Sequence, residues 1–305
     1  MADSIRLAGS IGIILLLLFV SVPSSAQIED QLKAYTGDNG TGYLQPLADA
    51  FGSDLNCGLF HSAHIPETGV HISFGFRVMS VIFGSDDRTF GATTESGFSP
   101  KRTTQAPTVV GPGEAVLVDG NGGTQFAFPG GFDLNSFALA VPQLRIGAFR
   151  GTEALIRFFA INTGDVELGN ISIFGFGLRH SLSQYRGPDL PVDVSAGFFW
   201  QKFSVGDDLL DSSAFTAGVQ AGKRFERGLL VLQPYTGLAV DVFSMDVAYE
   251  SEASGTAEDI EIDFGQNTTL HLTMGLSLNL AYVNLHAEYN VAAQNSFSFG
   301  ISFGN

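Results

Sequence analysis

Residues 295–304 read NSFSFGISFG, and this stretch alternates between two kinds of side chain. Phe297, Phe299, Ile301 and Phe303 take every second position, whereas the positions between them carry serine or glycine. A period of two residues is typical of a β-strand with one apolar and one polar face. The stretch therefore predicts a strand whose two faces meet different surroundings.

The same alternation recurs along the chain and predicts ten strands. They lie near residues 68–82, 138–149, 152–163, 168–182, 191–205, 212–225, 228–249, 264–279, 281–292 and 295–304. Their polar faces carry mostly Gly, Ser, Asn and Gln, with few of the charges that a water-facing sheet usually shows. We therefore predict an all-β fold, an antiparallel transmembrane β-barrel of about ten strands, in preference to a soluble β-sandwich.

The composition excludes several other classes of protein. The 305 residues include 37 Gly and 27 Phe, and only 15% are charged, which excludes a disordered chain and a coiled coil. The 15 basic and 31 acidic residues give a net charge of −16, so a basic nucleic-acid-binding protein is excluded as well. One cysteine cannot form an intrachain disulfide.

The first 26 residues predict a secretory signal peptide. Arg6 precedes an apolar run at residues 11–22, and residues 23–26, PSSA, supply small side chains for cleavage before Gln27. The apolar run is shorter than the roughly 20 residues of a membrane-spanning helix, so a membrane anchor is the weaker interpretation. Export combined with a barrel predicts the bacterial outer membrane.

Strand parity predicts short periplasmic turns and two long outer loops, at residues 83–137 and 250–263. Within the first loop, residues 115–118 and 124–128 predict a small hairpin. The second loop is acidic, and two interpretations stay open: a solvated rim, or divalent-cation binding that bridges lipopolysaccharide.

Residues 27–66 precede the predicted barrel at 67–305. A short amphipathic helix is expected at residues 43–51, with Thr41 as its N-cap. Because its apolar stripe needs a partner, this segment is expected to plug the lumen from the periplasmic side or to cap the lumen below. The stripe consists of Leu44, Leu47 and Phe51.

The polar faces also carry ionisable side chains, which are expected to line the lumen because a charge facing lipid costs about 2–4 kcal/mol at the bilayer midplane. These candidate ligand-binding or lumen-lining residues are Arg77, Arg145, Glu153, Arg157, Arg179, Asp193, Asp241, His271, His286 and Glu288. One interpretation is a wall that attracts anions. The other is salt-bridge packing of a narrow interior, in which Glu153 and Arg157 pair as neighbours on one strand.

Cys57, His61, His64 and His71 form a C-x3-H-x2-H-x6-H pattern of residue types that bind zinc. No helix is predicted to orient these histidines, and no second cysteine is present, so we predict no metal site. The chain shows no nucleophile elbow, phosphate-binding loop or dinucleotide motif. We therefore expect neither an enzyme nor a cofactor.

Several motifs carry a resemblance to known proteins. They are YLQPLADAFG at 43–52, PGG at 129–131 with AVPQ at 140–143, GTE at 151–153 with Arg157, and GLRH at 177–180 with LPVD at 190–193. With them the chain resembles an uncharacterised family of bacterial outer-membrane β-barrel proteins, and more distantly the long-chain fatty-acid transporters of the outer membrane. The second likeness implies an N-terminal hatch and passage of hydrophobic molecules, although those transporters have more strands.

The leading functional prediction is a barrel that binds or transports a small ligand, hydrophobic if the second likeness extends to function. The alternative is a structural or adhesive surface barrel that acts through its outer loops. The expected partners are outer-membrane lipids and lipopolysaccharide, with no nucleic acid, and the chain is expected to be a monomer. A continuous apolar cavity would favour transport, and a filled polar interior would favour the structural role.

Overall fold

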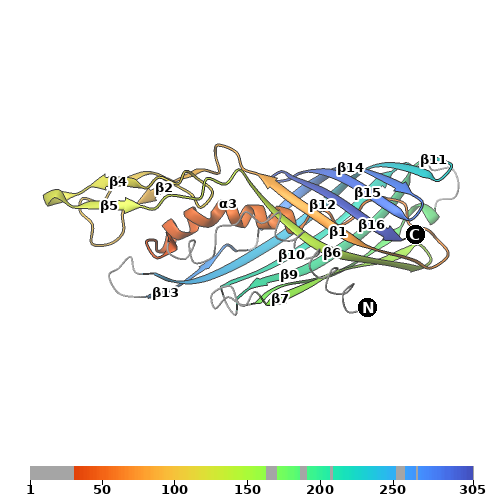
Figure 1. The fold of residues 1–305 in the computed structure, drawn as a ribbon, viewed down its shortest axis with the longest axis horizontal. Coiled ribbons are helices and arrows are strands. Elements are labelled where there is room, and N and C mark those ends of the chain that lie inside the picture. The colour runs from red at the N-terminus through yellow and green to blue at the C-terminus, as the bar shows by residue number, and fades with distance from the viewer. Residues whose placement is uncertain are drawn as a thin grey trace, which may run out of the picture.

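The computed structural model describes residues 31–162, 170–185, 191–206, 209–251, 258–265 and 267–304. They form a closed antiparallel barrel that holds helix α3 (Gly37–Leu55) in its interior (Figure 1). The predicted signal peptide lies outside the described residues. Within them, no helix combines the length and the hydropathy needed to cross a membrane.

Ten strands make the barrel wall. They are β1 (His71–Ile82), β6 (Ser136–Phe149), β7 (Thr152–Asn162), β8 (Asn170–Ser181), β9 (Asp193–Val205), β10 (Leu210–Gly222), β12 (Leu230–Ser251), β14 (Asn267–Leu280), β15 (Val283–Val291) and β16 (Ser296–Gly304). Each pairs antiparallel with its neighbours, and the β1–β16 and β10–β12 pairings close the ring. The predicted ten-stranded barrel is confirmed.

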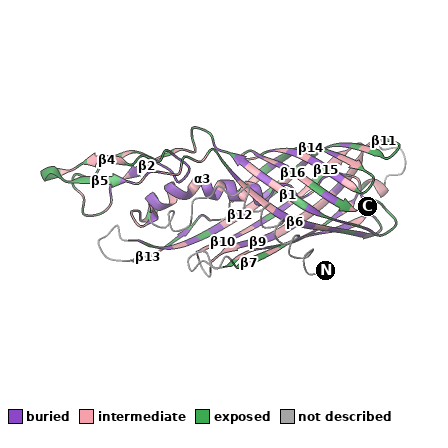
Figure 2. Cartoon of the chain, in the orientation of Figure 1, coloured by how far each residue is buried: buried purple, intermediate pink, exposed green. Residues whose placement is uncertain are grey.

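The wall has an apolar exterior and an interior that is polar over much of its length. In β16, Phe299 and Phe303 are both 55% exposed, while Ser298 and Ser302 are buried. Buried residues alternate with more exposed ones along the other long strands too, most regularly in β1 and β12 (Figure 2). A soluble sandwich would bury its apolar face instead, so the apolar outer face and polar inner face match the pattern of transmembrane β-barrels.

The two ends of the barrel differ. At the short-turn end, two-residue turns at 150–151, 228–229 and 281–282 join neighbouring strands. Arg150 and Gly151 both have positive φ, +46° and +69°, which is the backbone twist that tight hairpins prefer. The opposite, long-loop end carries the connection between β1 and β6.

That connection contains two hairpins that project beyond the barrel (Figure 1). Strands β4 (Val116–Asp119) and β5 (Gln125–Phe128), separated by the 3-10 turn η1 (Asn121–Gly123), confirm the predicted hairpin. Strands β2 (Thr89–Thr93) and β3 (Thr103–Pro107) were not predicted. Their threonine-rich sequence lacks the apolar alternation on which the other strands were recognised.

The second predicted loop, at 250–263, is largely strand in the described residues. β12 continues to Ser251 and pairs with β13 (Glu258–Asp263). Ile262 on β13 points inward and is buried, whereas the acidic Asp259 and Glu261 are exposed. The acidic composition obscured a period of two in the sequence.

Two short elements lie at the short-turn end, β11 (Phe225–Arg227) and the 3-10 turn η2 (Ser183–Tyr185).

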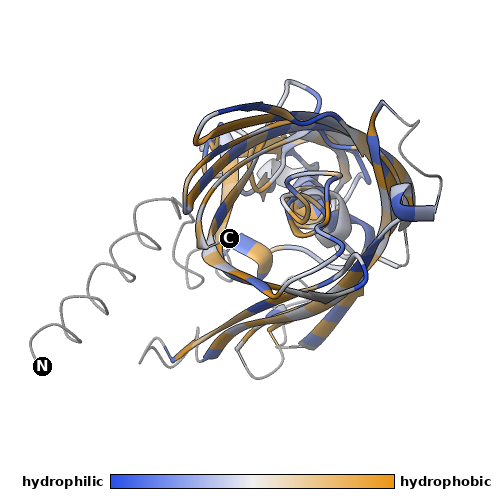
Figure 3. Cartoon of the chain, turned by 90° about the vertical axis from the view of Figure 1, so that its right-hand side faces the viewer, coloured by the Kyte–Doolittle hydropathy of each residue, from blue (hydrophilic) through white to orange (hydrophobic). Residues whose placement is uncertain are grey.

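Helix α3 is longer than the predicted helix at 43–51, and it begins after Thr36, so Thr41 is not its N-cap. Its first turns contain glycines with low helix propensity, and packing inside the barrel stabilises them. The helix starts at the long-loop end and runs into the lumen along the barrel axis (Figure 3). The N-terminal end of the helix therefore lies at the long-loop end, and not at the short-turn end from which the sequence predicts a plug or cap.

Candidate functional site: a lumen filled by the N-terminal segment

Residues 31–66, called the plug below, fill the lumen in two different ways. In the half nearer the long-loop end, called the outer half below, α3 packs against inward-facing apolar side chains. The Phe51 ring lies 4.6 Å from the ring of Phe137 and 5.3 Å from that of Phe203, measured between centroids. This contact is part of a buried apolar cluster, which burial from water stabilises. Further wall members of the cluster are Met79, Val81, Phe83, Phe243, Met245 and Val247.

The segment between β1 and β6 that contains the two hairpins is hydrogen-bonded to the first turns of the helix. The Asn39 amide donates to the Thr93 carbonyl at 2.7 Å and accepts from the Thr93 N–H at 3.0 Å. Glu95 accepts hydrogen bonds from Asn39 and from the Thr36 hydroxyl. The Tyr43 hydroxyl donates to the carbonyl of Gly130 at 3.1 Å. Helix and hairpins are therefore one packed unit at the long-loop end.

After Leu55 the plug continues as an irregular chain through the half of the lumen nearer the short-turn end, called the inner half below. Irregular backbone leaves carbonyl groups without partners, and buried carbonyls need donors. Wall side chains supply these donors in the following bonds: Arg157 to the carbonyls of Leu55 (3.3 Å) and Cys57 (2.9 Å), Gln201 to Leu55, Gln143 to Leu59 (3.1 Å), Tyr235 to Phe60 (3.2 Å), and Arg179 to Ser62.

Arg157 is the centre of this arrangement. It is fully buried, donates from Nε to Gln143 at 3.0 Å and from Nη1 to Gln201 at 3.4 Å, and lies 5.4 Å from the Phe199 ring centroid. The predicted pairing of Arg157 with Glu153 is wrong. The two side chains are four residues apart on one strand, about 13 Å along it.

Glu153 instead joins a buried cluster of charges. It lies directly opposite Arg179 on β8, and Arg179 Nε donates to it at 2.8 Å. Arg145 Nη1 lies 3.6 Å and His71 Nε2 3.4 Å from the same carboxylate. Cross-strand neighbours on one face are closer than residues four apart along a strand, which explains the choice of partner.

The remaining candidate residues also lie inside the barrel. Asp241 accepts from Thr216 at 2.5 Å, and its carboxylate lies 2.8 Å from His271 Nδ1. Glu288 accepts from the Gly58 N–H at 2.6 Å and from Tyr235 at 2.8 Å.

Three further candidates complete the set. Arg77 and His286 are buried side by side where Gly300 leaves room for both. Asp193 lies near the short-turn end, partly exposed, 3.3 Å from His64. The ten residues thus share one interior, and most of them bind the plug or each other.

The cysteine and the histidines of the C-x3-H-x2-H-x6-H pattern do not converge on one point, and each histidine has its own partners. His61 lies 2.6 Å from Arg145, His64 binds Arg224 and Asp193, and His71 lies against Glu153. Within the described residues, no three His, Cys, Asp or Glu side chains are arranged to hold a metal ion.

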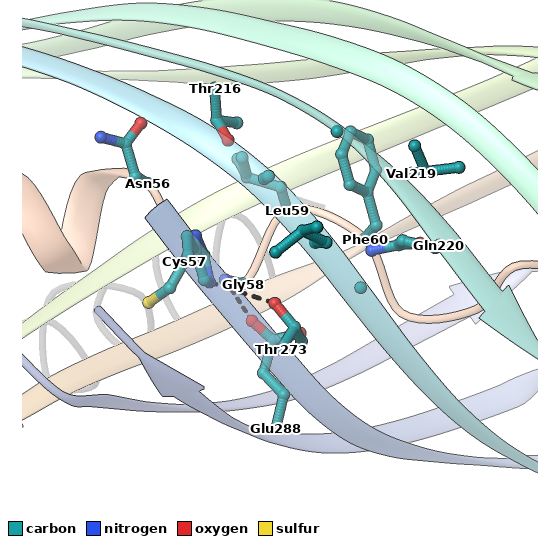
Figure 4. Close-up of a pocket in the computed structure, with 15 residues that line it drawn as sticks. Asn56, Cys57, Gly58, Leu59, Phe60, Thr216, Val219, Gln220, Thr273 and Glu288 are labelled. Carbon is teal, nitrogen blue, oxygen red and sulfur yellow. Dashed lines mark hydrogen bonds between the residues drawn. The ribbon is translucent and has the colours of Figure 1, made fainter. Parts of the chain in front are cut away.

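A small cavity remains beside the irregular part of the plug (Figure 4). It has a volume of about 30 Å³ and lies between residues 56–60 and strands β10, β12 and β14. Gly218, Gly237 and Ala239 line it on the wall side, where larger side chains would fill the space. The volume is sufficient for a water-sized molecule.

Sequence reasoning missed the uncharged donors of the inner half, Gln143, Gln201 and Tyr235. A signal for them is present: each lies on the same strand face as an arginine or acid that was identified. In this protein, long amide side chains in the middle of a lumen-facing row therefore indicate contacts with the plug as well as charged side chains do.

A closed barrel with an apolar belt outside and a polar, filled interior is the architecture of bacterial outer-membrane β-barrels, and the fold resembles them. The chain belongs to the family of unknown function DUF6588, whose model matches residues 7–305. No curated protein matches the sequence.

Solved outer-membrane barrels align with the structure at low identity. Ail, the attachment invasion locus protein of Yersinia pestis, is 12% identical with a TM-score of 0.27, over 78% of this chain and 98% of that chain. The translocator domain of the autotransporter NalP from Neisseria meningitidis is 13% identical with a TM-score of 0.30, over 87% and 98%. The Ralstonia pickettii toluene transporter TbuX is 10% identical with a TM-score of 0.19, over 80% and 92%. The barrel assignment rests on the strand pairing of this chain itself.

Proposed function

We propose that this protein is an outer-membrane barrel closed by its own N-terminal segment, which displays its two projecting hairpins at the cell surface in a structural or adhesive role. In this proposal the short-turn end faces the periplasm and the long-loop end faces the outside. Short periplasmic turns and long outer connections are the usual arrangement of such barrels.

The observation that carries the proposal is the filled lumen. α3 occupies the outer half, and the hydrogen-bonded chain of residues 56–66 occupies the inner half. A cavity of about 30 Å³ beside the plug has no room for a drug-sized ligand, which needs about 300 Å³ or more. Arg157 and Arg179 donate to plug carbonyls, and Arg179 also donates to Glu153, which favours a structural role for these arginines over an anion-attracting wall.

Channel recording tests whether the barrel is closed. The purified protein, reconstituted in planar bilayers, is expected to show no steady single-channel openings. Discrete, long-lived openings in protein whose folding is verified by its band shift on unheated gels would contradict a closed barrel.

Trypsin digestion of intact cells tests the display of the hairpins. Lys101 and Arg102 are exposed on the loop that joins β2 and β3. Trypsin added outside is expected to cut there, and the Lys101→Gln/Arg102→Gln variant is expected to resist at this position. Cleavage that requires permeabilised cells would place the hairpins in the periplasm and overturn the orientation.

Binding of a small hydrophobic ligand is the second candidate, and the cavity beside Leu59 and Phe60 is the observation that favours it. Such a ligand must enlarge the cavity by moving residues 56–60. Ligand binding is then expected to accelerate labelling of the buried Cys57 thiol by a maleimide. An unchanged labelling rate across hydrophobic compounds would count against this candidate.

A further inference from the structure

The short strand β11 extends the β10–β12 hairpin beyond its neighbour β10 at the short-turn end. Lys223 N–H donates to the Pro234 carbonyl at 3.1 Å, and β11 then pairs Phe225 with Leu232 and Arg227 with Leu230. Leu230 and Leu232 are 40% and 37% exposed on the outer face of the barrel. Because directly opposed residues share a face, Phe225 and Arg227 lie on that outer face as well.

Lys223 belongs to the same row. Its Nζ lies 5.6 Å from the centroid of the Phe225 ring, a cation–π contact that places both side chains on one side. Glu226 lies on the opposite face, and its carboxylate is 2.8 Å from Arg224 Nε. Lys223, Phe225 and Arg227 thus form an outward-facing row, called the basic stripe below. In the described part of the chain, neither Lys223 nor Arg227 has an ion-pair partner, and both are exposed.

The basic stripe lies at the edge of the apolar belt. The row that contains Arg227 continues through Leu230 to Leu280, which is 54% exposed. The adjoining turns present Leu229 and Tyr282, 74% and 71% exposed, and the Ala281 N–H donates to the Leu229 carbonyl at 3.3 Å. Exposed tyrosine, leucine and cationic side chains at the end of an apolar belt are typical of the level where hydrocarbon gives way to lipid headgroups.

We infer that the basic stripe binds the phosphate groups of anionic phospholipids in the leaflet that surrounds the short-turn end. The inference rests on the proposed membrane insertion. A guanidinium binds phosphate oxygens bidentately, the lysine adds a point charge, and Phe225 between them contacts the lipid beside its headgroup. The chain as a whole carries a net charge of −16, so two unpaired outward cations in a row are a local feature that selects an anionic partner.

Lipid competition measures this binding. The full-length mature protein is reconstituted in phosphatidylethanolamine vesicles with or without phosphatidylglycerol, extracted, and analysed for retained lipid by native mass spectrometry. The wild-type protein is expected to retain phosphatidylglycerol selectively. The Lys223→Gln/Arg227→Gln variant is expected to lose about 30-fold in relative affinity, which corresponds to about 1 kcal/mol for each basic residue near an anionic surface.

The Lys101→Gln/Arg102→Gln variant is the matched control, because it removes the same charge from the outer hairpin and is expected to keep the selectivity. Equal retention of phosphatidylglycerol by the stripe variant and the wild type, both inserted and folded, would overturn the inference alone. Failure of the wild type to insert into either kind of vesicle would overturn the proposed function instead. Free inorganic phosphate that competes as well as the lipid would reject a lipid-headgroup site.

Discussion

The two halves of the lumen hold the same plug by different forces. In the outer half the plug is helical, so its backbone groups bond within the helix and the wall can be apolar: Phe51 meets Phe137 and Phe203. In the inner half the plug is irregular, and the wall changes to Arg157, Gln143, Gln201 and Tyr235, which donate to its carbonyls. The chemistry of the wall therefore follows the backbone conformation of the segment that it surrounds.

This difference gives the buried arginines a physical explanation. A lone buried cation is costly, and charge pairing compensates only part of the cost. Arg157 is compensated largely by carbonyl and amide dipoles, and Arg179 by both Glu153 and the Ser62 carbonyl. Arg157 and Arg179 therefore bind the plug as well as other wall side chains.

The largest effect is expected from Arg157→Leu in the inner half. Four buried acceptors lose charge-assisted hydrogen bonds, and the free energy of unfolding is expected to fall by about 3–5 kcal/mol. Urea unfolding in detergent micelles, followed by Trp200 fluorescence, measures the loss. Arg102→Leu on the outer hairpin is the control and is expected to change stability by less than about 0.5 kcal/mol. A loss below about 1 kcal/mol for Arg157→Leu would mean that the carbonyl contacts contribute little.

In the outer half, Leu47→Ala is expected to lower the free energy of unfolding by about 2–3 kcal/mol, because it leaves a cavity between α3 and the wall. Leu47→Met keeps the volume and is expected to cost under about 1.5 kcal/mol. The same unfolding assay compares the two variants. If the outer half were held by polar contacts instead, Leu47→Ala would cost no more than Leu47→Met.

The smallest effect is expected where the two halves join. Gly58 has φ +66°, and an added Cβ would lie 2.6 Å from Ser298 Oγ. Gly58→Ala is therefore expected to cost about 1–2 kcal/mol from the left-handed backbone, with the contact adding to it. Gly69→Ala separates the two causes, because Gly69 has φ +84° and open space around it. Equal losses in both variants would show that the approach of Ser298 contributes nothing.

Much of the wall could be predicted from the sequence, because one period of two residues determines both the strand and its apolar outer face. Arg77, Arg145, Arg157 and Arg179 could be placed inside the barrel on that basis, since a slip of one residue would turn them to lipid. Their partners could not be predicted. Arg157 binds carbonyls of Leu55 and Cys57, and the path of that irregular chain leaves no periodic signal.

The plug shows the same limit. The apolar stripe of Leu44, Leu47 and Phe51 identifies a helix that needs a partner, but it does not tell from which end the helix enters. The wall residues determine where the helix lies. Inward-facing apolar residues such as Phe203 and Phe243 lie in the outer half, so the helix packs there. The end from which the helix enters depends on which residues of different strands lie at the same height in the barrel. The stagger between neighbouring strands sets these heights.

The most direct test of the filled lumen uses the one native cysteine. The Cys57 thiol lies beside the Ser296 side chain on β16, and Ser296 is buried on the inner face. Mild oxidation of the Ser296→Cys variant in outer-membrane preparations is expected to join plug and wall by a disulfide, seen as a mobility shift on non-reducing gels. Ser302→Cys, on the same face about 20 Å along the strand, is expected to stay unlinked. Folded Ser296→Cys protein that forms no disulfide, or equal cross-linking of both variants, would contradict a plug held at this position in the barrel.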